Sequence, residues 1–247
     1  MINVPQANTN MTAPLPDNET KRLAALRRYE VLDTTAEQAF DDFAFLASTI
    51  CDTPIALMSL VDGERQWFKA RIGLDVTETP REQAFCAHTI LGEDVMVVED
   101  AHADARFALN PLVTGDPRIR FYAGAPLIDR DGYALGSLCV IGRTPRALPP
   151  TQRKALQALA RQIISQLEFR RASADLAAAL TDIKTLYGLL PICSHCRGIR
   201  NDAGYWQSVE SYVKEHTDAD FSHSICPPCL KTHHPKTYER LHAEGRI

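Results

Sequence analysis

Four of the seven cysteines in this 247-residue chain form two matched pairs with Cys-x-x-Cys spacing. Cys193 and Cys196 lie in "ICSHC", and Cys226 and Cys229 lie in "ICPPC". A turn of this spacing places two sulfur atoms on one side of a metal ion, and a second such turn completes a tetrahedron of thiolates. The pairs therefore predict a structural Zn²⁺ site with these four cysteines as its ligands.

The sequence between and around the pairs is compatible with such a site. The intervening segment 197–225 is longer than in most zinc ribbons, and it has room for a turn at 201–204 and a helix at about 205–216. His195 and Arg197 lie beside the first pair, where they can offset the negative charge of a four-thiolate centre. Because the segment has few large apolar residues, we expect metal binding to drive its folding.

Other uses of these residues remain open. The "CPPC" turn is also typical of a catalytic dithiol, and a zinc site can itself be switched by oxidation of its cysteines. His223, His233 or His234 could replace one cysteine as a ligand. The duplication favours structural zinc, since a redox centre needs only one pair.

The charge of the segment bears on its partners. Residues 188–247 contain seven Lys and Arg and seven Asp and Glu, so the basic footprint that phosphate binding requires is missing. Nucleic acid is therefore an unlikely partner, and a transcription regulator acting through the tail is the weaker alternative. A protein contact through Tyr205, Trp206 and Tyr212 is favoured.

Hydrophobic periodicity upstream of the tail predicts an α+β fold. Helical spacing of apolar residues gives way to extended runs around two Asp-Gly turns, at 62–63 and 131–132. Strands joined by tight turns form antiparallel sheets, and helices pack on such a sheet. The expected order is helices at 19–34 and 36–51, two strands within 54–73, a helix at 81–91, a strand at 95–100, a loop at 101–120, two strands within 121–142 and a long helix from about 150.

Three stretches carry a resemblance to a known family. "RQWFKARIGLDVTETPREQAFCAHTIL", "DARFALNPLVTG" and "RFYAGAPLIDRDGYALGSLCVIGRTPRAL" together resemble the GAF domains of bacterial sensor proteins, over about residues 20–170. The resemblance implies a GAF-type antiparallel sheet flanked by helices. It also implies a small-molecule site on the concave side of the sheet, under the 80–122 region. Its expected lining is Trp67, Phe85, His88, Arg106 and Tyr122, whereas Cys51, Cys86 and Cys139 are expected to be buried core residues.

A third element joins this domain to the tail. Apolar residues step by three and four alternately, as in a coiled-coil heptad, so a connector helix that pairs with a second copy of the chain is predicted. An amphipathic helix folded back on its own domain is the alternative. The heptad residues are Phe169, Ala172, Leu176, Ala179, Ile183, Leu186 and Leu190.

The predicted organisation is therefore a flexible arm at 1–18, a GAF domain at 19–150, a coiled-coil connector at 151–190 and a zinc module at 191–247. The last module resembles a small cysteine-paired tail found on bacterial receiver and sensor proteins. Apolar and charged shares of 45% and 23% are ordinary for a globular protein. No apolar run is long enough to span a membrane, and no secretory signal is visible, so a cytoplasmic protein is expected.

The absence of recognisable catalytic motifs favours a protein that is not an enzyme. No phosphate-binding glycine loop, kinase motif or nucleophile elbow is found. We therefore expect a homodimeric signal-transduction sensor or adaptor that docks a kinase, receiver or other signalling protein. A thiol redox enzyme, or a redox-switched zinc protein, is the alternative.

Overall fold

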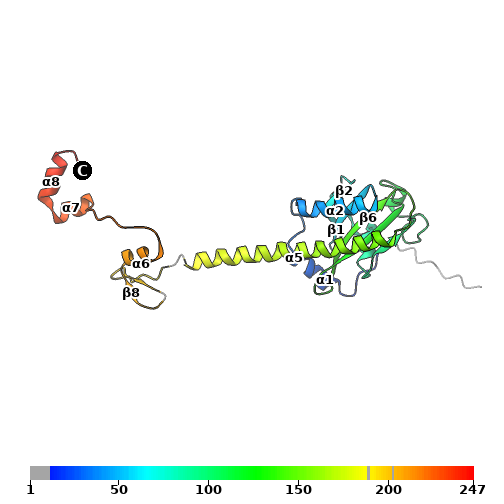
Figure 1. Cartoon of the computed structure of the whole chain (residues 1–247), viewed down its shortest axis with the longest axis horizontal. Coiled ribbons are helices and arrows are strands. Elements are labelled where there is room, and N and C mark those ends of the chain that lie inside the picture. The colour runs from blue at the N-terminus through cyan, green and yellow to red at the C-terminus, as the bar shows by residue number, and fades with distance from the viewer. Residues whose placement is uncertain (1–11, 188–189, 202) are drawn as a thin grey trace, which may run out of the picture. The chain divides into compact units, whose positions relative to one another are not determined.

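The computed structural model describes residues 12–187, 190–201 and 203–247, with backbone only at 181–187. The first eleven residues of the expected arm lie outside the described residues. The chain divides into two compact units, one ending at Ala177 and the other beginning at Ala178 (Figure 1).

The first unit is organised around a six-stranded antiparallel sheet with the strand order β3-β2-β1-β6-β5-β4. Both predicted strand pairs are confirmed, whereas the short edge strand β3 was not predicted. The strands are β1 (Ile55–Val61), β2 (Arg65–Ile72), β3 (Glu78–Pro80), β4 (Met96–Val98), β5 (Phe121–Ile128) and β6 (Ala134–Gly142).

Helices cover one face of this sheet (Figure 1). They are α1 (Glu19–Arg28), α2 (Gln38–Cys51) and the first half of α5 (Pro150–Tyr187). Because side chains alternate along a strand, Met58, Leu60 and Val140 belong to one buried cluster with residues of these helices, such as Phe40 and Ile163. This cluster is the larger of the two apolar cores.

The opposite face carries a second apolar cluster, under shorter elements. The 3₁₀ turn η1 (Arg81–Gln83), α3 (Phe85–Thr89), α4 (Pro111–Thr114) and the loops between them provide its cover. The alternate residues of the same strands, Leu57, Cys139 and Ile141 among them, pack here with Phe85 and Phe107. The sheet is therefore buried on both faces.

Two tight turns connect the central hairpins, as the Asp-Gly signals predict. Asp62 N–H donates to the Arg65 carbonyl at 2.8 Å and closes the β1–β2 hairpin. In the β5–β6 hairpin, the Asp129 carboxylate accepts from the backbone N–H groups of Asp131 and Tyr133 at 3.0 and 2.8 Å. Gly132 has φ +83°, a conformation that glycine adopts without strain.

Buried charged side chains attach α1 to the sheet. Arg22 is only 1% exposed, and its guanidinium donates to the Glu19 carboxylate at 2.7 and 2.9 Å. Arg81, which precedes α3, contacts the same carboxylate. Glu19 therefore pairs two buried cations, which would be costly to leave without a counter-charge.

Helix α5 changes character along its length. Leu156, Ile163 and Leu167 are buried against the sheet. Beyond them, Phe169 and Leu176 are 67% and 62% exposed. The long connector helix is thus confirmed, whereas the side chains of the expected heptad residues Ile183 and Leu186 lie outside the described residues.

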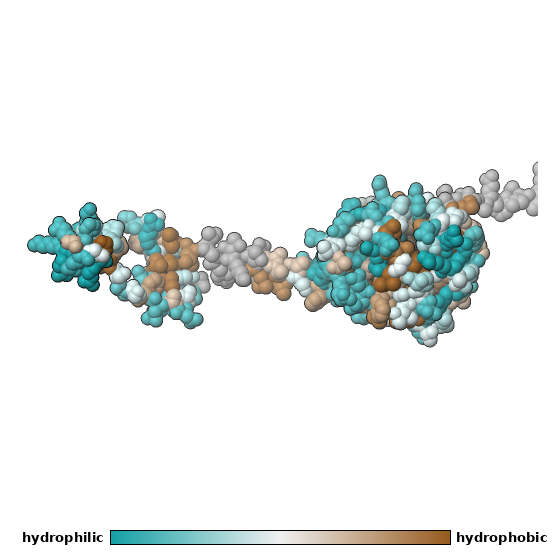
Figure 2. Space-filling model, turned by 90° about the horizontal axis from the view of Figure 1, so that it is seen from above, coloured by the Kyte–Doolittle hydropathy of each residue, from teal (hydrophilic) through white to brown (hydrophobic). Residues whose placement is uncertain are grey.

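The second unit consists of short elements, and hydrophobic residues lie on its surface (Figure 2). A two-stranded ribbon of β7 (Ile199–Arg200) and β8 (Trp206–Gln207) was not predicted. The expected helix begins later than predicted, at Val209, because Ser208 caps it by accepting from the Ser211 N–H at 3.1 Å. The helices are α6 (Val209–His216), α7 (Pro227–His233) and α8 (Pro235–Ala243).

Candidate ligand cavity and cysteine pairs

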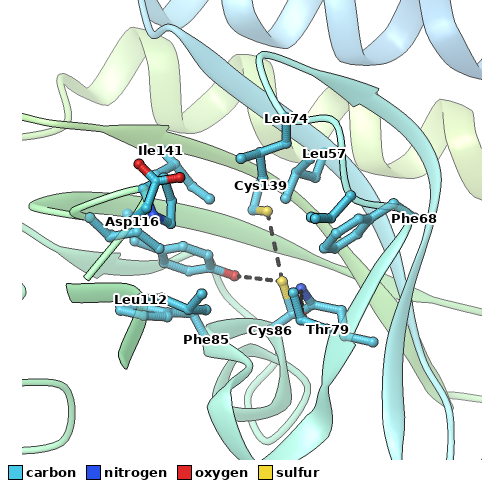
Figure 3. A pocket seen from close by; sticks show the side chains of 15 residues that line it. Leu57, Phe68, Leu74, Thr79, Phe85, Cys86, Leu112, Asp116, Cys139 and Ile141 are labelled. Carbon is cyan, nitrogen blue, oxygen red and sulfur yellow. Dashed lines mark hydrogen bonds between the residues drawn. The ribbon is translucent and has the colours of Figure 1, made fainter. Parts of the chain in front are cut away.

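A cavity of about 170 Å³ lies within the second apolar cluster of the first unit. Its walls come from β1, β2, β5, β6 and α3, and from the segment that contains α4 (Figure 3). Most of its wall is apolar. The lining residues are Leu57, Gln66, Phe68, Leu74, Val76, Thr79, Phe85, Cys86, Leu112, Asp116, Pro117, Ile119, Tyr122, Cys139 and Ile141.

Strand register explains why these side chains meet. Tyr122 of β5 lies opposite Ile141 of β6, and Gly124 lies opposite Cys139, so the side chains of alternate residues share the cavity face. A Cβ atom at Gly124 would lie 2.2 Å from the Tyr122 hydroxyl oxygen. Glycine at this position therefore leaves room for the tyrosine ring to lie along the strand.

Two thiols contact each other in the cavity wall. The sulfur atoms of Cys86 on α3 and Cys139 on β6 are 3.7 Å apart (Figure 3). The Tyr122 hydroxyl donates to the Cys86 sulfur at 3.3 Å, and it also shares a hydrogen bond of 2.6 Å with Thr89. Cys86 and Cys139 are buried, as expected from the sequence, but their contact with each other was not predicted.

This pairing makes the two thiols unequal. Burial by itself raises the pKa of a thiol, but hydrogen bonds from neighbouring groups, foremost the Cys139 thiol, outweigh burial and lower the pKa of Cys86. The hydrogen bond to Cys86, together with burial, raises the pKa of Cys139. Of the two, Cys86 is the one that ionises first.

The cavity wall also holds an acceptor without a partner. Gln66 is 5% exposed, and its Nε2 donates to Thr79 Oγ1 at 3.4 Å. Among the described residues, none donates to its buried Oε1. An unpaired buried oxygen is costly, so a ligand with a hydrogen-bond donor would offset that cost.

Of the five residues expected to line a ligand site, two lie in the cavity wall and three do not. Phe85 and Tyr122 line the cavity, and Phe85 stacks on Phe107 with 3.9 Å between ring centroids. Trp67 does not, because it belongs to the helix-covered cluster on the other face of the sheet.

The other two expected residues also lie outside the cavity wall. The ring of His88 makes an edge contact with that of Phe107, with 4.9 Å between centroids. Arg106 is 45% exposed and pairs with Asp104 at 2.6 Å.

The tail cysteines form two local pairs. The Cys196 N–H donates to the Cys193 sulfur at 3.5 Å, and the Arg197 N–H donates to the Cys193 carbonyl at 2.9 Å. Cys226 is the residue that precedes α7, and Cys229 lies in its first turn. Within the described part of the chain, no group of three or more His, Cys, Asp or Glu side chains is close enough to hold a metal.

In each pair, hydrogen bonds lower the pKa of one cysteine. Backbone N–H groups, beginning with that of Cys196, lower the pKa of Cys193. The Cys229 N–H and thiol lower the pKa of Cys226, whereas the hydrogen bond to Cys226 raises that of Cys229. Thiolates are the form in which cysteine binds zinc. The donors therefore suit zinc, and the four-cysteine site remains a prediction.

None of the described helices combines the length and the apolar character that crossing a bilayer requires.

Comparison with known proteins identifies the first unit. The profile of the GAF domain family matches residues 28–167, which is more than half of the chain. A cyclic di-GMP phosphodiesterase of Pseudomonas aeruginosa is 45% identical over 164 residues, which make up 66% of this chain. The match covers 28% of the length of that enzyme.

Two solved structures are among those similar to this chain. The GAF domain of an Acinetobacter phosphoenolpyruvate-protein phosphotransferase is 17% identical, with a TM-score of 0.47, over 64% of this chain and 97% of that domain. A bacteriophytochrome from R. palustris is 12% identical, with a TM-score of 0.48, over 69% of this chain and 41% of its own. Likeness at this level says nothing about activity.

The Pseudomonas relative corrects one prediction from the sequence. The expectation that the protein is not an enzyme, which rests on the absence of recognisable motifs, is wrong, because a relative with 45% identity is named an enzyme. The sequence that the two proteins share lies mainly in the GAF domain. The chain belongs to the GAF domain family, and its GAF domain is a sensor of signal transduction.

Proposed function

We propose that this protein is a signalling sensor whose GAF domain binds a compact small molecule in the cavity beside Tyr122. The observation that carries the proposal is the cavity itself, whose wall includes Gln66, a residue with a buried Oε1 that lacks a partner among the described residues. Pockets with an apolar wall and few polar groups are typical ligand sites. The free cysteines fit a reducing compartment such as the cytoplasm.

The cavity volume limits the size of this ligand. An apolar cavity of about 150 Å³ holds benzene, and sites for drug-sized ligands measure about 300–1,000 Å³. At about 170 Å³, the cavity suits a molecule of one or two small rings, or a short branched chain. A donor group on that molecule would bond to Gln66.

Two probes of equal shape test this inference. Indole carries one N–H donor, and 1-benzothiophene has the same outline without a donor. Thermal unfolding should show a larger rise in Tm with indole, because a ligand that binds only the folded state stabilises it. Gln66→Leu should remove the difference between the probes, and Val76→Trp at the 52% exposed Val76 should weaken both. Equal shifts in wild type and Gln66→Leu, or no shift with either probe, would contradict the proposal.

For the tail, we propose one structural zinc per chain held by Cys193, Cys196, Cys226 and Cys229. The matched spacing of the two pairs supports this assignment, as do the neighbouring N–H groups that lower the pKa of Cys193 and Cys226. Zinc binding would bring the two pairs together, and zinc sites of this kind supply the folding energy of small modules. Tyr205 and Trp206 are 74% and 56% exposed, which suits a surface that docks a signalling protein.

For α5, we propose pairing with the same helix of a second copy. Phe169 and Leu176 are exposed and seven residues apart, so they share the face that a coiled coil buries. A homodimer would place two GAF domains at one end of the paired helices. A ligand in either domain would then alter the packing that α5 transmits.

The Pseudomonas relative suggests the signalling context. Its name assigns it to cyclic di-GMP hydrolysis, so we propose that this chain also acts in cyclic di-GMP signalling. The small cavity makes a regulatory input the favoured role of the GAF domain. The test is to assay hydrolysis of cyclic di-GMP by the purified chain, and its effect on the rate of a separate phosphodiesterase. No effect in either assay would contradict this context.

A further inference from the structure

The cavity wall contains a buried pair of thiols that ligand binding does not require. Cys86 and Cys139 are 1% and 0% exposed, and their sulfur atoms are 3.7 Å apart although the residues are 53 positions apart in sequence. Both residues line the cavity. A pair of core thiols surrounded by packed side chains would be inert, whereas this pair borders a space that a small molecule can occupy.

We propose that Cys86 and Cys139 are a peroxide-reactive dithiol, in which a small hydroperoxide entering the cavity oxidises Cys86 and the pair then closes to a disulfide. The assignment rests on the cavity and on the contact between the sulfur atoms. It does not depend on the ligand of the proposed function.

The reaction is balanced with hydrogen peroxide as the oxidant. The Cys86 thiolate attacks one peroxide oxygen, so that an S–O bond forms and the O–O bond breaks. The leaving hydroxide takes up the proton that Cys86 released and becomes water. The Cys139 sulfur then attacks the sulfenic acid, the S–O bond breaks, and a second water leaves with the Cys139 proton. Two thiols lose two electrons, and one peroxide becomes two waters.

The surroundings of Cys86 identify it as the attacking thiol. The Tyr122 hydroxyl donates to its sulfur at 3.3 Å, and the Thr89 hydroxyl fixes that tyrosine through a bond of 2.6 Å. The Cys139 sulfur contacts the Cys86 sulfur and serves as the resolving thiol. Sulfur atoms of a disulfide are about 2.05 Å apart, so closure requires the pair to approach by roughly 1.7 Å, and the adjacent space permits that movement.

The cavity also selects the oxidant. A volume of about 170 Å³ accepts hydrogen peroxide or a small organic hydroperoxide. Glutathione disulfide, or a protein disulfide, is too large to reach a pair that is at most 1% exposed. The expected selectivity is therefore for small hydroperoxides over disulfide reagents.

Peptide mapping of the full chain tests the proposal. The reduced, zinc-loaded protein is treated with hydrogen peroxide and then denatured in the presence of an alkylating reagent, which caps the remaining free thiols. The protein is then digested with trypsin. Cleavage after Arg81, Arg106, Arg130 and Arg143 releases Cys86 in 82–106 and Cys139 in 131–143. We expect these two peptides to be recovered linked by a disulfide, and the tail cysteines in other peptides to serve as the reference.

Variants separate the two roles. Cys139→Ser should stop the reaction at a sulfenic acid on Cys86 that dimedone traps, and Cys86→Ser should leave Cys139 alkylated. Tyr122→Phe should slow the linkage several-fold. Cys51→Ser is the matched control, because Cys51 is equally buried at 1% exposure and belongs to the other cluster; it should leave the linked peptide unchanged.

Two results would overturn the proposal. One is that both thiols remain alkylated at peroxide concentrations that oxidise half of the tail cysteines. The other is that dimedone labels Cys139 in the Cys86→Ser variant but does not label Cys86 in the Cys139→Ser variant. If Cys86→Ser does not fold, Cys86→Ala carries the same expectation.

Discussion

The two units of this chain are stabilised in different ways. In the first, apolar clusters cover both faces of a sheet, and large side chains such as Phe40 and Tyr122 are fully buried. In the second, Ile199 is the one buried residue among those described from 190 onward, and Trp206 is 56% exposed. Burial of apolar surface is the dominant stabilising term in folding, so the second unit needs another source of stability.

The two units therefore carry their reactive groups in different settings. The GAF domain buries enough apolar surface to remain folded with a cavity in its core, and the wall of that cavity contains polar groups. The tail has little apolar area, and its sulfur atoms are the groups able to organise it.

Replacing the tail cysteines should have the largest effect. We expect one zinc per purified chain, and less than a tenth of that in the double variant Cys193→Ser/Cys226→Ser. Structural zinc contributes about 10–16 kcal/mol in small zinc-dependent modules, so the tail should lose its structure. Elemental analysis and NMR dispersion of the full chain measure both. Full zinc content in the double variant would exclude the proposed ligand set.

A core substitution in α2 should have the next largest effect. Phe40 is fully buried, so Phe40→Ala should lower the free energy of unfolding of the GAF domain by about 3–5 kcal/mol through lost burial and a residual cavity. Phe45 lies on the same helix and is 59% exposed. Phe45→Ala should change stability by less than about 0.5 kcal/mol. Chemical denaturation measures both, and similar costs would contradict the assignment of the two faces.

The ion pairs of Glu19 should make stability depend on pH. Burial would raise the pKa of Glu19, but hydrogen bonds from Arg22 and Arg81 outweigh it and lower the pKa from 4.5 to about 2. Such a carboxylate contributes up to about 3 kcal/mol, fully present above pH 4.5 and lost as pH falls toward 2. Glu19→Gln should remove that part of the pH dependence, as measured by urea unfolding at pH 7 and pH 3.

The matched control for this change is Glu82→Gln, at an exposed position. The Glu82→Gln variant should lose as much stability as the wild type when the pH falls from 4.5 to 2. If the Glu19→Gln variant also loses as much, the ion pairs with Arg22 and Arg81 do not govern acid stability.

Substitutions on the exposed face of α5 should have the smallest effect on folding. Phe169→Asp with Leu176→Asp removes apolar groups that are exposed in the single chain, so the unfolding of the GAF domain should change little. The same variant should sediment as a monomer where the wild type sediments as a dimer. A wild type that is monomeric at tens of micromolar would exclude pairing through α5.

Much of the GAF fold could be predicted because its signals are local. Alternation along β5 and β6 and the Asp-Gly turns specify strands and hairpins within a few residues of each other. The short strand β3 was missed because three residues are too few to show a period. Ser208 was overlooked as a helix cap, which placed the start of α6 too early.

The site was harder to predict because it depends on contacts between distant segments. Trp67 and Phe68 are adjacent and point to opposite faces of β2, and composition alone does not show which of them faces the cavity. The contact between Cys86 and Cys139 depends on how α3 crosses β6. Strand alternation does show that Cys139 shares a face with Tyr122, and this signal could have identified half of the pair.

Hydrogen–deuterium exchange of the full chain, with zinc and after its removal by a chelator, tests the contrast between the units most directly. We predict that amides in β1, β2, β5 and β6 keep their protection in both states, because apolar burial holds the sheet. Amides in α6 and α7 should be protected with zinc and should exchange within the shortest labelling time without it. Equal protection of α6 and α7 in the two states would contradict a metal-dependent tail, and loss of protection in the sheet would contradict an independently stable GAF domain.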